Sequence, residues 1–175
     1  MPQDRKLLLE RVARIIASAE RRRPTKERYE LAWSSMLPYD ESSIDHVGDV
    51  TSCVYEIWEQ RGAGTTAVYI GETKDLERRL REHKGASEQN DNFKRANFDR
   101  LYFSYAEIGR HVARKMVERA LWKLYQYEWN NENGPTGAST RGVVEIAEEF
   151  PEFYTINFNG ARRVMKGVIS PVLLP

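Results

Sequence analysis

Two short apolar stretches near the middle of the chain have the pattern of neighbouring β-strands. Residues 53–58 read CVYEIW and residues 66–71 read TAVYIG, and both are rich in β-branched and aromatic residues, which favour strands. The segment between them contains two glycines and is short enough for a hairpin turn. The pattern therefore predicts two paired strands, with Tyr55 in the first and Tyr69 in the second.

The spacing of apolar residues changes after Gly71. Leu76 and Leu80 recur four positions apart, and Thr73 stands where an N-cap is expected, so we expect an amphipathic helix after the hairpin. Most other positions of this helix are basic: Arg78, Arg79, Arg81, His83 and Lys84.

Upstream of the hairpin the pattern predicts two helices. Residues 4–23 place leucine, isoleucine and valine at helical spacing among basic side chains. Pro24 breaks this helix, and residues 25–36 predict a second helix that ends near Pro38. Residues 37–52 are acidic and rich in turn-forming residues, which indicates a connector.

Downstream of the hairpin the pattern predicts two more strands and a long helix. Residues 85–99 are polar and rich in asparagine, so we expect a mobile surface loop. Residues 101–108 alternate and predict a third strand, and a helix is expected from 112 to about 129. The tail has a predicted strand at 151–158 and an unassigned segment at 161–170.

The composition is typical of a globular protein and limits the kinds of metal ion that the chain could bind. The 175 residues are 41% hydrophobic and 30% charged, as in an ordinary globular protein. No apolar run approaches the roughly 20 residues that cross a bilayer, and the N-terminus lacks a signal-peptide pattern, so we expect a cytoplasmic protein. With Cys53 as the single cysteine and three scattered histidines, any metal would be a hard ion held by carboxylate and water.

The net charge of +1 hides a segregation of charge along the chain. Residues 31–60 carry six acidic and no basic side chains, whereas residues 94–123 carry eight basic and three acidic ones. A phosphate ligand needs a local basic patch rather than a basic average, and such a patch is available here. The alternative is that these bases only solvate the faces of helices.

The hairpin and the helix together resemble the start of the GIY-YIG nuclease superfamily. CVY at 53–55 stands at the first tripeptide of that family, and YIG at 69–71 matches the second. The helical arginine of the family follows the second tyrosine by ten positions, which is Arg79, and His83 lies one turn further. Glu118 and Asn130, twelve positions apart, match its later glutamate and asparagine, and the resemblance covers residues 51–133.

The resemblance implies an α+β fold with a small three-stranded antiparallel or mixed sheet flanked by helices. We expect residues 1–50 to form an N-terminal helical extension and connector, and residues 51–133 to form the nuclease core. Residues 134–175 would form a C-terminal extension that packs on the core. The N-terminal helices could pack on the domain, help to form a homodimer or touch DNA.

The resemblance also implies a metal-dependent endonuclease that cuts DNA, of a restriction-like or mobile-element type. Glu118 would bind one divalent ion, Mg²⁺ or Mn²⁺. Arg79 would contact the scissile phosphate, a role that suits the planar fork of a guanidinium. Lys74 would add positive charge at the same phosphate.

The remaining roles concern the attacking water and the support of the site. Tyr55 would act as the general base or pass the proton on, with Tyr69 and His83 hydrogen-bonded nearby; the family does not assign the base uniformly to one of the two tyrosines, so Tyr69 is the alternative base. A free tyrosine has a pKa near 10, so cations would have to lower that value for it to act as a base at neutral pH. Asn130 would support the glutamate helix or the water shell of the metal.

Other interpretations of the same residues are structural. The two tyrosines could be ordinary strand aromatics, and Glu118 could form a surface ion pair with Arg114. At the level of function, the alternative is a catalytically inactive module on the same scaffold that binds nucleic acid or protein.

Overall fold

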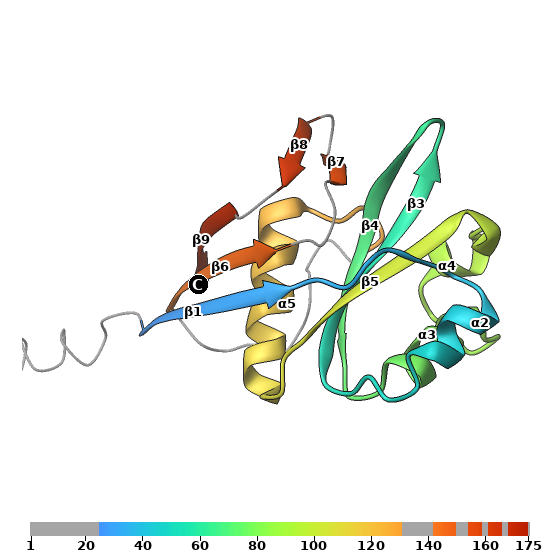
Figure 1. Cartoon of the computed structure of the whole chain (residues 1–175), viewed down its shortest axis with the longest axis horizontal. Coiled ribbons are helices and arrows are strands. Elements are labelled where there is room, and N and C mark those ends of the chain that lie inside the picture. The colour runs from blue at the N-terminus through green and yellow to red at the C-terminus, as the bar shows by residue number, and fades with distance from the viewer. Residues whose placement is uncertain (1–24, 131–141, 150–153, 159–160, 166–167, 175) are drawn as a thin grey trace, which may run out of the picture.

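A four-stranded antiparallel sheet forms the centre of the structure, a computed structural model (Figure 1). Its strand order is β2–β5–β3–β4. The strands are β2 (Leu37–Pro38), β3 (Cys53–Arg61), β4 (Gly64–Thr73) and β5 (Leu101–Glu107). Two helices were predicted to flank three strands, and the short strand β2 adds a fourth by pairing with β5. The α+β class predicted from the sequence is confirmed.

The structure describes five segments of the chain: residues 25–130, 142–149, 154–158, 161–165 and 168–174. The helix predicted at residues 4–23 lies outside them. None of the helices in these segments is long and apolar enough to span a membrane.

The hairpin predicted from the apolar pattern is confirmed. β3 and β4 pair from Cys53 with Thr73 to Arg61 with Gly64. Gly62 opens the two-residue turn with a φ of 63°, a left-handed conformation that glycine adopts without steric cost. A register shift between Ile57 and Trp58 marks a bulge in the hairpin.

Helices cover both faces of this sheet (Figure 1). α2 (Glu41–His46), α3 (Leu76–Lys84) and α4 (Asp91–Arg95) lie on one side, and α5 (His111–Tyr125) lies on the other. Each face has its own apolar core, one built around the inner face of α3 and the other around α5.

A second sheet covers the far side of α5 and joins the two ends of the described chain. β6 (Gly142–Glu149) lies between β1 (Thr25–Ala32), to which it is parallel, and β9 (Val168–Leu174), to which it is antiparallel. β7 (Tyr154–Phe158) and β8 (Ala161–Met165) form a hairpin. The strand predicted at 151–158 is therefore present from 154, and the unassigned tail supplies two further strands.

Several predicted elements need correction. The helix predicted at residues 25–36 is wrong, because 25–32 form β1. The predicted loop at 85–99 contains α4 and the start of a 3₁₀ turn, η1 (Phe98–Arg100), and Phe93 of α4 is buried. The helix predicted to reach residue 129 ends at Tyr125, where Gln126 caps it in a left-handed conformation. The division of the chain at residues 50 and 133 stays a prediction.

Candidate active site

Tyr55 lies at the centre of the candidate site, on the α3 side of β3. Its side chain is fully buried, and its partner across the hairpin is Gly71. A Cβ on Gly71 would lie 2.6 Å from the Cζ and the hydroxyl of Tyr55. The glycine of the YIG tripeptide thus leaves the space that the phenol occupies.

Tyr69 faces the same side of the sheet as Tyr55. The two ring centroids are 6.0 Å apart, and the Tyr69 ring packs edge-on against His83 at 5.3 Å. Two residues of separation on a strand place side chains on the same face, so the register of the hairpin alone brings these tyrosines together.

Arg79 and His83 reach the phenols from α3. The helix begins at Leu76 because Asp75, not Thr73 as predicted, is its N-cap and accepts a hydrogen bond from the Arg78 amide at 2.9 Å. Residues 76, 80 and 83 are buried on its inner face. The positive charge of Arg79 acts on both phenols.

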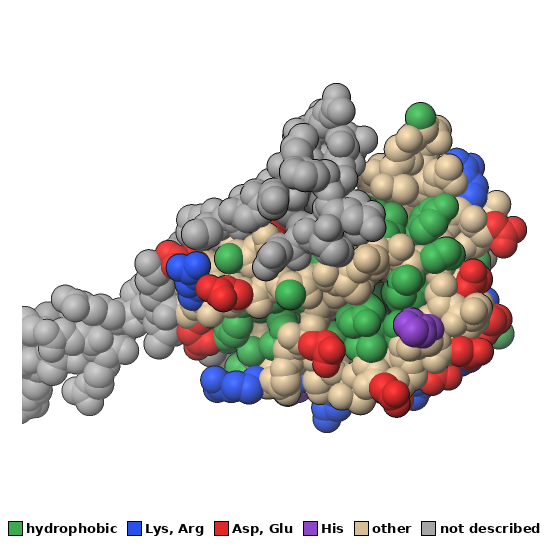
Figure 2. All heavy atoms as spheres, in the orientation of Figure 1, with side chains coloured by type: hydrophobic (Ala, Val, Ile, Leu, Met, Phe, Trp, Pro, Cys, Tyr) green, Lys and Arg blue, Asp and Glu red, His purple; other side chains and the backbone are tan. Residues whose placement is uncertain are grey.

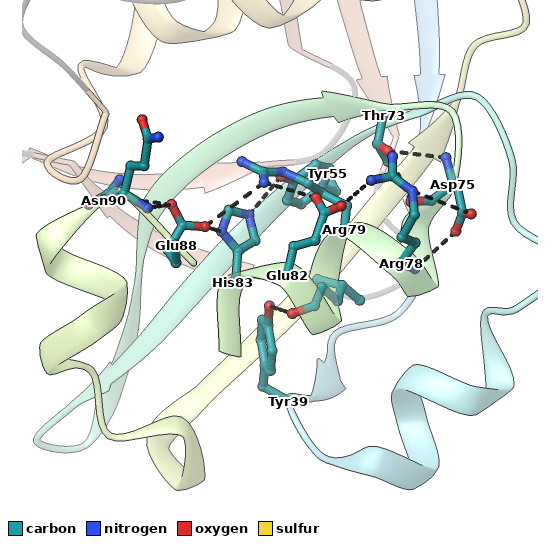
Figure 3. Close-up of polar contacts among 12 residues, drawn as sticks. Tyr39, Tyr55, Thr73, Asp75, Arg78, Arg79, Glu82, His83, Glu88 and Asn90 are labelled. Carbon is teal, nitrogen blue, oxygen red and sulfur yellow. Dashed lines mark hydrogen bonds and ion pairs between the residues drawn. The ribbon is translucent and has the colours of Figure 1, made fainter. Parts of the chain in front are cut away.

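A chain of hydrogen bonds runs from Tyr55 through His83 to Glu88 (Figure 3). The Tyr55 hydroxyl lies 2.9 Å from Nε2 of His83, and Nδ1 of the same ring lies 2.6 Å from Oε2 of Glu88. The imidazole is 2% exposed and stacks on Phe93 with centroids 3.9 Å apart. Both faces and both nitrogens of His83 are therefore fixed by neighbouring groups.

Burial and charge set the protonation of this chain. Burial raises the pKa of Tyr55 well above its ordinary value, and the positive charge of Arg79 offsets this only in part. Burial and then the charge of Arg79 lower the pKa of His83 to about 4, against the opposing pull of Glu88. Burial would raise the pKa of Glu88, but the Asn90 amide, His83 and Arg79 outweigh it and the pKa falls. At neutral pH the phenol and the imidazole are neutral and Glu88 is ionised.

Glu118 approaches the site from α5. Its charge acts on Tyr69 and Arg79. Burial, and next the charge of Glu72, raise the pKa of Glu118 to about 8. Glu72 is bound by the fully buried Arg114, with Nε to Oε2 at 3.1 Å. Arg114 therefore pairs with Glu72 and not with Glu118.

Asn130 binds the backbone of β4 rather than the phenols of Tyr55 and Tyr69. Its Oδ1 accepts from the Ile70 amide at 3.0 Å, and its Nδ2 donates to the Ile70 carbonyl at 2.8 Å. The Trp129 amide donates to the Val68 carbonyl at 2.8 Å. The segment after α5 thus covers the edge of β4 as a further strand would, which ties the end of the Glu118 helix to the hairpin.

The outward face of α3 does not offer free positive charge. Arg81 is bound by Glu41, Asp45 and Glu77, and Lys84 is bound by Glu41. Around the edge of the face in Figure 2, basic and acidic side chains of the described residues alternate. The acids of the predicted connector, now in α2, therefore neutralise the basic helix, whereas Lys74 is exposed immediately after β4.

Sequence reasoning missed some residues of this site. Glu88 was assigned to a loop, and no local pattern shows which carboxylate of that loop reaches His83. Tyr39, in the predicted connector, donates to the Leu80 carbonyl at 2.9 Å, and its pKa is raised by burial although Arg79 opposes this. Cys53, at the position of the family's first glycine, has its side chain buried beside α3, so a Cβ fits there.

The carboxylate of Glu118 suits a single hard cation. The described part of the chain holds no group of three or more His, Cys, Asp or Glu side chains that could enclose a metal. A buried carboxyl with a pKa of about 8 is nevertheless mostly protonated at neutral pH, and a nearby cation would hold it ionised. Glu118 with water ligands therefore fits a metal of the Mg²⁺ type.

Comparisons with known proteins address the family of the chain. Residues 51–133 match the family model described as the GIY-YIG catalytic domain. The search of curated proteins gives no match, and neither does the search of solved structures. Domains of this family are generally endonucleases and typically depend on a divalent metal. The strand pair, α3 and the Glu118 helix all fall within the matched residues, so residues 51–133 form a domain of the GIY-YIG nuclease superfamily.

Proposed function

We propose that this protein is a metal-dependent endonuclease that hydrolyses phosphodiester bonds in DNA, of a restriction-like or mobile-element type. The observation that carries this proposal is the convergence of unlike groups from separate elements. Tyr55 and Tyr69 come from the hairpin, Arg79 and His83 from α3, and Glu118 from α5, and they interact with one another by contact or charge.

Arg79 suits the role of phosphate ligand. Its side chain is 30% exposed, and Nη1 lies 3.2 Å from Oε2 of Glu82 and 3.9 Å from Oε2 of Glu88. A guanidinium that is partly open and held by a solvent-facing acid can exchange that acid for a phosphate, which its planar fork also binds. The phosphate would then lie near both phenols, because Arg79 is close enough for its charge to act on both in the free protein.

The raised pKa of Tyr55 supports the role of proton relay over that of a preformed general base. A phenol with a strongly raised pKa is not a phenolate at neutral pH, so it does not wait in the site as a preformed base. It can still take a proton from the attacking water if it gives its own proton away at the same time. The contact of its hydroxyl with His83 supports this relay role.

Glu118 would hold the divalent ion, Mg²⁺ or Mn²⁺. When bound, such an ion stabilises negative charge on the phosphoryl and leaving oxygens. The neighbouring Lys115 and Arg79 lower the pKa of Glu118 too little to ionise it fully near neutral pH. The carboxylate is therefore available to a cation and is not consumed by an ion pair with Arg114.

Cleavage assays with a matched pair of variants test this function. Purified protein is incubated with plasmid DNA, single-stranded DNA and RNA, with and without Mg²⁺. We expect Mg²⁺-dependent cutting of DNA, and Glu118→Gln should reduce it by about 10²-fold or more while DNA binding persists. The control is Glu107→Gln, which alters an exposed glutamate at the end of β5. Equal cutting by Glu118→Gln and wild type would contradict the metal role, and binding without any cutting would favour the inactive-module alternative.

Thermal unfolding gives a readout of the metal that does not depend on cutting. A ligand that binds only the folded state raises the melting temperature with concentration. We expect Mg²⁺ at neutral pH to raise the melting temperature of the wild type and of Glu107→Gln. The same titration should leave Glu118→Gln unchanged.

A further inference from the structure

Both oxygens of Glu88 are committed in the structure. Oε1 accepts hydrogen bonds from the backbone amides of Gln89 and Asn90, each at 2.8 Å, and Oε2 faces Nδ1 of His83 at 2.6 Å. The loop that carries Glu88 is itself anchored, because the Asn90 side chain caps α4 and donates to the Trp129 carbonyl at 2.8 Å. The side chain of Glu88 is 7% exposed. This carboxylate therefore has one orientation and presents an acceptor to the ring (Figure 3).

That acceptor decides which ring nitrogen carries the proton. An ionised carboxylate can only accept, so the Nδ1 that faces it must donate. In a neutral imidazole the other nitrogen, Nε2, then has the free lone pair, and the hydroxyl of Tyr55 must be the donor in the 2.9 Å contact. The hydrogen bonds thus run in one direction, from Tyr55 to His83 and from His83 to Glu88.

We propose that Glu88 is a positioning residue that holds His83 in the Nδ1–H tautomer, so that Nε2 is the acceptor for the proton of Tyr55. Its consequence for cleavage rests on the proposed nuclease function. There the water oxygen bonds to phosphorus and its proton passes to the Tyr55 oxygen, while the proton of Tyr55 passes to Nε2. The bond from phosphorus to the leaving oxygen breaks with its electron pair on that oxygen, which takes a proton from bulk water.

The charges around His83 suit a proton acceptor whose basicity increases when a phosphate binds to Arg79. Arg79 and Glu82 face the ring from α3, Glu88 from the loop, and the phenols of Tyr55 and Tyr69 from the sheet. After burial, Arg79 is the largest influence against a second proton on the ring. A phosphate bound by Arg79 would compensate its charge, and the ionised Glu88 would then stabilise the imidazolium.

Nuclear magnetic resonance can read the tautomer directly. A two-bond ¹H–¹⁵N correlation spectrum of protein with labelled histidine distinguishes a protonated from an unprotonated ring nitrogen. We expect His83 of the wild type, free of DNA and metal at neutral pH, to be neutral with its proton on Nδ1. A proton on Nε2, or an imidazolium, would overturn the proposal.

Glu88→Gln should reverse the chain of hydrogen bonds. The backbone amides of Gln89 and Asn90 require an acceptor, so the amide oxygen of the glutamine would face them and its NH₂ group would face Nδ1. We expect the proton of His83 to move to Nε2. In a Ser-His-Asp catalytic triad, replacing the aspartate with asparagine also produces the wrong histidine tautomer, and kcat falls by about 10⁴-fold. Cleavage should fall by roughly 10²- to 10⁴-fold.

Two further variants keep the outcome decisive. Tyr55→Phe removes the other partner of the ring, and the Nδ1–H tautomer should persist because Glu88 sets it. Glu82→Gln removes a nearby carboxylate that contacts Arg79 instead of the ring, and the tautomer should again persist. If Glu88→Gln keeps the proton on Nδ1, the proposal fails. If the tautomers behave as expected but no nucleic acid is cut, the positioning role stands and the nuclease function fails.

Discussion

The two faces of β3 carry two buried groups of acids and tyrosines, and the groups differ in the charge of their acids. Tyr55 points to the α3 side and belongs to the candidate site, whereas its neighbour Glu56 points to the α5 side. Glu56 is 1% exposed and accepts a hydrogen bond from the hydroxyl of Tyr127. Its other oxygen has no hydrogen-bond partner within the described segments.

The pKa values of the buried acids on the two faces are shifted in opposite directions. Burial and then the charge of Glu148 raise the pKa of Glu56 well above its ordinary value, which favours its neutral form in the folded protein. The pKa of Glu88 is lowered, because the Asn90 amide and the charges of His83 and Arg79 outweigh its burial. The difference teaches that burial alone does not decide protonation. Burial raises the pKa of both carboxyls, and beside Glu88 the donors and cations on the α3 side outweigh it.

The largest effect on the site side is expected from Gly71→Ala. The added Cβ would lie 2.6 Å from the Tyr55 ring, which is fully buried and cannot move away freely. Overpacking of this kind costs about 1–3 kcal/mol of unfolding free energy, and a phenol displaced by about 1 Å costs about 10²-fold in cleavage. Denaturant unfolding and plasmid cleavage measure the two effects.

Gly109→Ala is the matched control for this substitution. A Cβ on Gly109 meets no atom within 4 Å, so its stability and cleavage should remain those of the wild type. If Gly71→Ala cut DNA as fast as Gly109→Ala, the position of Tyr55 would not matter for the reaction.

The site side was also the more predictable side from sequence. The hairpin, α3 and β5 follow from local apolar spacing. The tyrosine pair is also a local property, because Tyr69 lies two residues before Gly71 and Gly71 pairs with Tyr55 in the hairpin. Glu88 was not predictable, because it lies five positions after His83 in a polar loop and only the fold of that loop brings it back to the ring.

The α5 side depends on contacts between distant segments, and sequence reasoning failed there. Residues 25–36 were interpreted as a helix that begins after Pro24 and ends near Pro38. The same residues alternate in burial, with Leu31 and Trp33 buried and Glu30 and Ala32 exposed, which is a strand pattern. The partner that selects the strand, β6, lies more than a hundred residues away, so tertiary pairing overrides helix propensity.

Glu56→Gln tests the neutral acid on the α5 side. A folded pKa above the ordinary value of 4.5 means that the folded state binds more protons than the unfolded state, so stability falls as pH rises from about 4.5 toward the folded pKa. A glutamine keeps the acceptor for Tyr127 and cannot ionise. The stability of the variant relative to wild type should therefore grow with pH, by at most about 1.4 kcal/mol per pH unit.

Urea unfolding at a series of pH values from 4 to 8 measures this difference, with Glu107→Gln as an exposed control. A difference that stays constant across the series would mean that Glu56 is ionised in the folded protein. The contrast between the two faces of β3 would then be lost.

A stability effect of opposite sign is expected from His83→Gln. The folded pKa of His83 is about 4, below its ordinary value of 6.5, because burial and Arg79 disfavour the imidazolium. The folded state thus binds fewer protons than the unfolded state between these values, and the wild type loses stability as pH falls from 6.5 toward 4. Glutamine removes this loss, so the stability of the variant relative to wild type should rise as pH falls. Part of the gain is offset, since the low pKa of Glu88 depends on the charge of His83.

Urea unfolding from pH 7 to 4.5 measures how the stability difference changes with pH. The control is His46→Gln, at an exposed position of α2. A slope of the same sign as that of Glu56→Gln would show that the two faces do not differ in charge as the hydrogen bonds indicate.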